Sequence, residues 1–243
     1  MDTLFFVSLF TYQRDKLMSN LFLRGWNWIC RFRHRCGYGV HSPSDFFLIT
    51  FVVYEHLPFY AYKVLHDKRK LVDGLPHYRE KTDKLLLRLV NHLQPASILE
   101  IGTGSGLASL YLSEGKHCPL YTMDEGESNP KVGQMLERYP SITYRCGDIR
   151  ALLHTYLKEQ PGLNLVHIAH TSYYKEIFEM LLPYVSSQTC FLIALPYATK
   201  EKKLWWRQVI DDPRTGVTFD LYDIGLVFFD QRRIKEHRMV NFL

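Results

Sequence analysis

The sequence predicts an α/β fold: a seven-stranded, mostly parallel sheet with a C-terminal antiparallel hairpin and a helical N-terminal region. Three observations lead to this prediction. From Pro95 onward, short apolar runs with strand character alternate with helical patterns, as they do in βαβ units. Near the end of the chain, two strand-like runs follow one another with only two residues between them, which indicates a hairpin. The first apolar run leads directly into three closely spaced glycines and a helix.

The composition is that of a folded globular protein. Its 243 residues suit one α/β domain with an N-terminal extension, and 47% apolar and 23% charged residues argue against disorder. The apolar runs are much shorter than the roughly 18–20 residues that span a bilayer, and the start lacks the basic region and the cleavage site of a secretory signal. The five cysteines form no CxxC pair. We therefore expect a cytoplasmic protein with reduced thiols, no membrane span and no zinc site.

The N-terminal third is expected to be helical. Weak helical patterning covers residues 1–35. Ser42 before Pro43, with an acid three residues after the serine, is typical of a helix start, and this helix is expected to stop before Pro58. A polar, basic connection over residues 63–73 leads to YREKTDKLLLRLVNHLQ, whose apolar residues recur at helical spacing.

The chain divides into two regions. Residues 1–77 are expected to form a helical N-terminal region or cap, and residues 78–243 the sheet domain. The strands are expected at Ile98–Ile101, Leu120–Met123, Ile142–Cys146, Leu163–Ala169, Cys190–Leu195, Val217–Tyr222 and Gly225–Phe229. The helices between them are expected at Ser105–Ser113, Pro130–Arg138, Ile149–Lys158, Tyr173–Leu182 and Lys200–Ile210.

The N-terminal region is basic. Residues 1–41 carry six Lys or Arg against two Asp, and arginines alternate with aromatic residues in GWNWICRFRHRCGYG. Arginines that contact phosphates and rings that stack on bases produce such a pattern in nucleic-acid sites, and anionic membranes attract it too. It also fits a helix packed on its own domain, with the arginine stems covering apolar surface. We favour packing, because no nucleic-acid motif accompanies the charge.

Gly102, Gly104 and Gly106 follow the first strand and open a helix. Such a turn lets a ligand approach the backbone, and the helix N-terminus is expected to offer free N–H groups. Leu107 stands where a dinucleotide site would need its third glycine, and no Lys-Ser/Thr pair follows, which excludes a P-loop. Glu100, just before the turn, would repel a pyrophosphate. It suits a ligand that has an ammonium group and no phosphate.

The pattern E-x-G-x-G-x-G resembles motif I of the class I methyltransferases that depend on S-adenosylmethionine (SAM), and so implies their Rossmann-like fold and SAM as cofactor. In that family an acid after the second strand holds the ribose hydroxyls, and PLYTMDEG has Asp124 there. An acid after the third strand reads adenine, where YRCGDIRALL has Asp148 beside the apolar Ile149. Each acid alone could instead be a solvated strand end or a helix cap. The expected cofactor residues are Glu100, Gly102, Thr103, Gly104, Gly106, Asp124, Asp148 and Ile149.

Two further segments, GYGVHSPSDFFLI and VTFDLYDIGLVFFDQRRIKEH, resemble a group of bacterial class I methyltransferases. That group carries polar segments after the fourth and fifth strands, similar to the acids that hold a divalent metal in catechol-type O-methyltransferases. Here Ala169, Ala194 and Leu195 replace the acids, and Tyr197 replaces a histidine. Alanine and leucine cannot ligate a hard cation, which needs oxygen ligands. We therefore expect no metal at the site.

Methyl transfer from SAM needs a positioned acceptor and, for a hydroxyl acceptor, a base. His170, expected at the end of the fourth strand, is the best candidate base, although a surface histidine that caps a helix explains it equally well. Tyr173, Tyr174 and Tyr197 are candidate wall or hydrogen-bonding residues. His41 is a candidate from a segment that could cover the pocket, although a helix start accounts for that segment better.

The sequence thus predicts a SAM-dependent methyltransferase for a small-molecule acceptor, without a metal and with oxygen favoured by family analogy. A second hypothesis is a SAM-binding protein that has lost catalysis and has a regulatory or scaffolding role, because of Ala169 and Ala194. A third is a nucleic-acid methyltransferase, but AHTSYY matches poorly the N/D-P-P-Y/F-like segment of that class. Glu100 and Leu107 disfavour an NAD-dependent reductase. The acceptor and the oligomeric state stay open, a homo-oligomer included.

Overall fold

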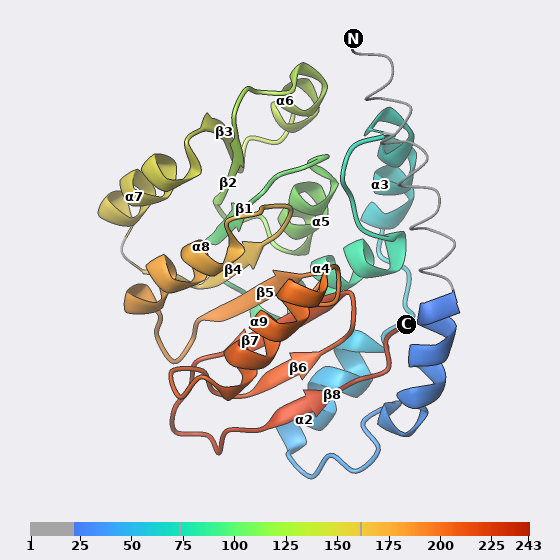
Figure 1. Ribbon diagram of the computed structural model, residues 1–243. Coiled ribbons are helices and arrows are strands. Elements are labelled where there is room, and N and C mark those ends of the chain that lie inside the picture. The colour runs from blue at the N-terminus through green and yellow to red at the C-terminus, as the bar shows by residue number, and fades with distance from the viewer. Residues whose placement is uncertain (1–21, 73, 161) are drawn as a thin grey trace.

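A computed structural model describes residues 22–72, 74–160 and 162–243. Most of the helix expected over residues 1–35 lies outside these ranges. An eight-stranded sheet runs through the molecule in the order β3-β2-β1-β4-β5-β7-β6-β8, and helices cover both of its faces (Figure 1). Within the described ranges, no helix combines the length and the apolar character that crossing a membrane requires.

The five strands that follow the N-terminal region are parallel, as predicted. β1 pairs with β2 on one side and with β4 on the other, so the winding direction reverses at β1. Open α/β sheets bind ligands beyond the carboxyl ends of their strands at such a reversal point. The strands span Ile98–Ile101 (β1), Leu120–Glu125 (β2), Ile142–Gly147 (β3), Leu165–Ile168 (β4) and Cys190–Ala194 (β5).

The predicted C-terminal hairpin is present, and a further strand follows it. β6 (Thr218–Asp220) and β7 (Ile224–Phe228) are antiparallel, and β7 lies between β5 and β6. β8 (His237–Met239) pairs in parallel with β6 at the edge of the sheet. The sheet therefore has eight strands where the sequence predicted seven, because three residues without a strand-like pattern pair with an available edge.

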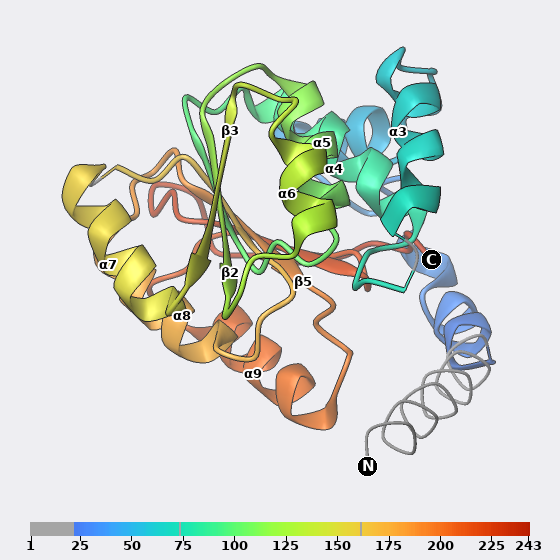
Figure 2. The same cartoon turned by 90° about the horizontal axis from the view of Figure 1, so that it is seen from above.

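The helices between the strands follow the prediction closely. They are α5 (Leu107–Gly115), α6 (Pro130–Leu136), α7 (Ile149–Glu159), α8 (Tyr174–Leu181) and α9 (Lys200–Asp211). Polar side chains cap three of them: Asn129, Asp148 and Thr199 accept from backbone N–H groups in the first turns of α6, α7 and α9. Figure 2 shows α7, α8 and α9 on one face of the sheet and α3 to α6 on the other.

The N-terminal region departs from the prediction in two places. The helix that begins with α2 (Pro43–Phe47) continues in wide π turns over Leu48–Val53 and ends there, earlier than expected. The basic connection expected over residues 63–73 is largely helical, as α3 (Ala61–Arg69) and a short 3-10 turn at Lys70–Val72. Leu65 alone of α3 is buried, so α3 lacks the repeated apolar positions that would have marked it as a helix.

Side chains from both sides of the predicted boundary at residues 77 and 78 share one core. Val53 of the π-turn segment and Leu65 of α3 are buried in the same cluster as Leu86 of α4 (Glu80–Leu93) and Leu110 of α5. The predicted cap is thus packed on the helical layer that covers the first strands.

The basic helix at residues 22–30 packs on its own domain. Arg24 donates to both carboxylate oxygens of Asp223, at 2.5 and 2.8 Å, and Arg31 donates to Asp220 at 2.9 Å. These acids lie at the turn between β6 and β7, beside the carboxyl end of β5. The contacts support the packing interpretation of the basic region, since two of its arginines already have carboxylate partners.

Candidate functional site

The glycine turn after β1 has a backbone that only glycine adopts readily. Gly102, Gly104 and Gly106 have φ values of +93°, +56° and +74°. A β-carbon at Gly102 would lie 2.6 Å from the backbone of His170, and one at Gly104 would lie 2.9 Å from the carbonyl oxygen of Pro76. The chain after β4 and the segment before α4 therefore lie directly against the turn.

The backbone N–H groups of the turn itself, before the helix N-terminus, already have acceptors. Those of residues 102–106 all donate to protein oxygens. Gly104 donates to the Asp124 carboxylate at 3.0 Å, and Ser105 donates to the carbonyl of Pro76 at 3.0 Å. The turn thus provides a close-fitting surface, and a ligand beside it would be held chiefly by side chains.

Asp124 lies beside the turn, as the sequence predicted for the end of β2. Its half-buried carboxylate also accepts from the backbone N–H of Glu125 at 3.0 Å, and burial raises its pKa. Asp148 is exposed and caps α7 by accepting from the Arg150 N–H at 2.9 Å. Ile149 packs its side chain into the core, where 1% of it is exposed. Among Asp124, Asp148 and Ile149, the candidates at the ends of β2 and β3, Asp124 is the one that hydrogen-bonds to the glycine turn.

Glu100 lies inside the protein, beneath the turn. Its side chain is fully buried and accepts from Ser109, from Thr122 at 2.7 Å and from His167 at 2.9 Å. Thr103 joins the same network through its hydroxyl, 2.7 Å from that of Thr122. Because protein donors surround the Glu100 carboxylate, it holds β1, β2 and β4 together under the turn. The direct contact with a ligand ammonium group that the sequence suggested has no support in this geometry.

Tyr78 and His167 also belong to this network, and the sequence analysis named neither as a site residue. The Tyr78 hydroxyl lies 2.8 Å from Nε2 of His167, whose Nδ1 faces Glu100, and all three side chains are buried. The Tyr78 ring also packs on His170, with 5.0 Å between the ring centres. Burial raises the pKa of Tyr78 well above its usual value, so the phenol stays protonated. His167 had a signal, a polar residue within the apolar strand LVHI, whereas Tyr78 had none.

His170 lies at the end of β4 and packs against the glycine turn, as its candidate role requires. Burial and the nearby His167 and Lys202 lower its pKa to about 4. The imidazole is therefore neutral at pH 7 and can accept a hydrogen bond. A base with so low a pKa is too weak to take a proton readily from an ordinary hydroxyl group.

The remaining candidates are dispersed. Tyr197 stacks on Tyr222, with ring centres 5.1 Å apart, and its hydroxyl donates to Asp220, so it belongs to the arginine-linked cluster at the hairpin. Tyr173 and Tyr174 line a cavity beyond β4 and β5. His41 is exposed and lies just before α2. α2 lies beside β8, which forms one edge of the sheet, whereas β3 forms the other edge (Figure 1). The structure therefore does not bring His41 to the glycine turn.

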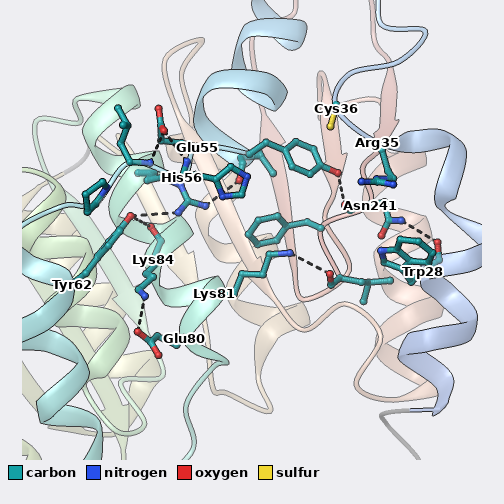
Figure 3. Close-up of a pocket in the computed structure, with 17 residues that line it drawn as sticks. Trp28, Arg35, Cys36, Glu55, His56, Tyr62, Glu80, Lys81, Lys84 and Asn241 are labelled. Carbon is teal, nitrogen blue, oxygen red and sulfur yellow. Dashed lines mark hydrogen bonds and ion pairs between the residues drawn. The ribbon is translucent and has the colours of Figure 1, made fainter.

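Two cavities are prominent in the described structure. The larger, about 680 Å³, lies between the helix at residues 22–30, the π-turn segment, α4 and the last residues of the chain (Figure 3). Its lysines and arginines have partners within the chain: Lys84 pairs with Glu80 at 2.7 Å, Lys81 donates to the Leu243 carbonyl, Arg88 donates to backbone carbonyls, and Arg35 lies over the Trp28 and Phe32 rings. The smaller, about 510 Å³, is formed by the chain after β4 and the start of α9. Its wall begins at Thr171, the residue after His170, and it lies beyond the carboxyl ends of β4 and β5, where open α/β sheets bind ligands.

The positions that the sequence analysis compared with metal-binding acids are apolar here. Ala169 is 2% exposed and Ala194 is 1% exposed, and Leu195 follows with a positive φ of 44°. In the ranges that the structure covers, no three residues among His, Cys, Asp and Glu are grouped so that they could hold a metal ion. The metal-free site stays a prediction.

The sheet is doubly wound, with the glycine turn after β1 and an acid after β2 at its reversal point. No family model matches the sequence, and a search of curated proteins finds no match. Solved structures do match. An O-methyltransferase from Bacillus cereus, in complex with SAH, has 17% identity and a TM-score of 0.55, over 73% of this chain and 95% of that one.

A second solved structure gives a similar result. The O-methyltransferase TomG from Streptomyces achromogenes, in complex with SAM, has 16% identity and a TM-score of 0.54, over 74% of this chain and 93% of that one. At such identities the likeness establishes the fold: the chain has the Rossmann-like α/β fold of these methyltransferases, and it spans nearly their whole length.

Proposed function

We propose that the protein binds SAM at the glycine turn and transfers its methyl group to a small molecule, without a metal ion. The observation that carries this proposal is the pairing of Gly104 with Asp124 at the reversal point of the sheet. The glycines let the backbone of the turn pass close to Asp124, whose carboxylate can grip a cis-diol through two charge-assisted hydrogen bonds. These features suit a nucleoside, and the absence of a lysine after the glycines makes the turn unsuited to a triphosphate.

Bound SAM would supply a methyl group on a positively charged sulfur. The protein's part is then to align an acceptor and to exclude water. In that transfer the acceptor oxygen would form a bond to the methyl carbon while the carbon–sulfur bond breaks and leaves its electron pair on sulfur, and a hydroxyl acceptor would also give up its proton to a base or to water. The products are the methylated acceptor and S-adenosylhomocysteine (SAH).

A catalytically silent SAM-binding protein is the second candidate. It is favoured by Ala169 and Ala194 at the ends of β4 and β5, and by the low pKa of His170. Turnover of any acceptor would exclude it. The third candidate, a nucleic-acid methyltransferase, loses support because Arg24 and Arg31 are paired with Asp223 and Asp220.

The deciding experiment is a calorimetric titration of the protein with SAM, SAH and NAD. We expect SAM and SAH to bind and NAD not to bind. Asp124→Asn removes the charge but keeps the size of the side chain, and it is expected to weaken SAH binding about tenfold or more, the effect of losing charge-assisted hydrogen bonds. Glu127→Gln, an exposed acid in the same loop, is the matched control and should bind SAH like the wild type. Binding of NAD alone, or of none of the three, would refute the proposal.

A further inference from the structure

The smaller cavity begins directly after the residue that packs on the glycine turn. Its wall includes Thr171, Tyr173 and Tyr174 from the chain after β4, and Thr199 and Lys202 from the start of α9. The His170 side chain lies against Gly104. The next residue in the chain, Thr171, is the first residue of the cavity wall. A molecule in the cavity would therefore approach the glycine turn past His170.

The cavity carries one cation without a carboxylate partner. Lys175 pairs with Glu201 at 2.6 Å, and Glu176 pairs with Arg150 at 2.6 Å, so these charges are neutralised locally. Within the described ranges, no ion pair joins Lys202 to a carboxylate. Its side chain is 7% exposed, and burial lowers its pKa to about 8, so it still carries a proton at neutral pH. A buried cation without a counter-ion favours an anion beside it.

The surroundings of Lys202 define the shape of that anion. Lys202 lies in the first turn of α9, a helix of 12 residues whose N-terminus adds to the positive potential, and Thr199 accepts from the Lys202 backbone N–H at 3.0 Å. The Lys202 ammonium lies 4.9 Å from the centre of the Tyr174 ring. Tyr173 is the second aromatic residue of the wall. Two tyrosine rings in the wall offer contacts that suit an aromatic group better than a branched aliphatic one.

We propose that this cavity is the acceptor site and that Lys202 binds the carboxylate of an aromatic acid, which the protein converts to its methyl ester. The inference rests on the proposed function and names its substrate class. Lys202 would hold one carboxylate oxygen, and the other would bond to the methyl carbon as the carbon–sulfur bond breaks and leaves its electron pair on the sulfur of SAH. The acceptor enters as an anion, so its negative charge and the positive charge of the sulfonium cancel, and no proton is transferred in the step.

The choice of a carboxylate over a phenol follows from the available bases. A carboxylic acid is ionised at neutral pH, whereas a phenol with a pKa near 10 must first lose a proton. His170, with a pKa of about 4, is a poor base for that purpose, and Ala169 and Ala194 cannot hold a metal that would acidify a phenol. An acceptor that is already ionised needs neither a base to remove a proton nor a metal to acidify it.

The test measures binding of benzoate, benzamide and phenol by ligand-detected NMR to the full-length protein saturated with SAH. Benzamide matches benzoate in shape but is neutral, and phenol represents the other oxygen acceptor. Lys202→Met removes the ammonium and keeps a long apolar side chain, while Lys202→Arg keeps the charge. Lys200→Met is the matched control, since it removes an exposed charge from the same helix turn outside the cavity wall.

We expect benzoate to bind more tightly than benzamide and phenol. Lys202→Met is expected to weaken benzoate binding about tenfold or more, as for a lost charge-assisted hydrogen bond, and Lys200→Met and Lys202→Arg should retain it. Equal binding of benzoate and benzamide, tighter binding of phenol, or an unchanged Lys202→Met would overturn the proposal. If SAH binds but benzoate does not, the acceptor assignment fails and the proposed function stands. If SAH itself does not bind, the proposed function fails first.

Discussion

Arg31 and Asp220 form a buried ion pair that joins the end of the N-terminal helix to β6. Arg31 Nη1 lies 2.9 Å from Asp220 Oδ1, and the two side chains are 5% and 1% exposed. Burial acts to raise the pKa of Asp220, but the guanidinium and the Tyr197 hydroxyl outweigh it and hold that pKa below its usual value. The N-terminal helix is therefore held by an interaction that solvent screens little.

Arg31→Met is expected to lower the free energy of unfolding by about 3–5 kcal/mol, because it leaves the Asp220 carboxylate buried without its cation. Urea denaturation measures this loss. Arg33→Met is the matched control: Arg33 is exposed two residues away, so its replacement should change stability by less than about 0.5 kcal/mol. Similar losses in the two variants would show that the pair contributes no more than a surface charge.

This ion pair also shows why the role of the basic region could not be decided from the sequence. The alternation of arginines and aromatic residues before residue 36 is compatible with bases, lipids or the protein's own surface, and the sequence favours the last only because no nucleic-acid motif accompanies the charge. Asp220 and Asp223 are 189 and 199 residues further along the chain than Arg31 and Arg24, and nothing in the local pattern pairs them with these arginines. The carboxylate partners that support the packing interpretation could be identified only from the fold.

The strands and helices from β1 to α9 could be predicted because each carries its own periodicity. β8 and α3 could not. β8 is three residues long and is held by backbone pairing to β6, and α3 buries only Leu65. In both, contacts made by the rest of the fold outweigh weak local preferences.

The residues of the candidate site likewise fall into some that the sequence could predict and others that it could not. The glycine turn and Asp124 are local features of two strand ends, and the fold places them together as expected. The chain from Glu100 through His167 to Tyr78 depends on contacts across 67 and 89 residues. Lys202 lies in the charged run KEKK, which resembles a solvated helix face, and only the fold shows that one of its three lysines is buried.

Gly104→Ala is expected to destabilise the protein more than Gly126→Ala. Both glycines have positive φ, +56° and +78°, so both variants have backbone strain of about 1 kcal/mol or more. Only at Gly104 would the added β-carbon also collide with Pro76 and His170. We expect an additional loss of about 1–3 kcal/mol from this overpacking. Thermal and urea unfolding of the two variants provide the comparison, and equal losses would mean that the segment before α4 yields easily.

Tyr78→Phe should lower stability by about 1–3 kcal/mol, since it leaves Nε2 of His167 buried without a partner. The ring itself is retained, so packing on His170 is preserved and the loss reports the hydrogen bond. Tyr60→Phe, at a fully exposed tyrosine, controls for the chemical change and should be neutral. A Tyr78→Phe variant as stable as the wild type would indicate that His167 finds another partner.

The low pKa of His170 makes stability depend on pH in a defined direction. In the folded protein this pKa is about 4, against about 6.5 for a histidine in the unfolded chain. Below pH 6.5 the unfolded state binds a proton that the folded state does not, so stability is lost as the pH falls from about 6.5 toward 4. Between pH 7.5 and pH 5 the expected loss from this residue is about 2 kcal/mol.

His170→Asn removes this contribution, so its free energy of unfolding should fall by about 2 kcal/mol less than that of the wild type over the same interval. His154→Asn, at an exposed histidine on α7, is expected to keep the pH dependence of the wild type. Urea titrations at pH 7.5 and pH 5 give the difference for each protein. Parallel curves for wild type and His170→Asn would mean that the imidazole is solvated. It would then be free to act as an ordinary base, and the reason for preferring a carboxylate acceptor would disappear.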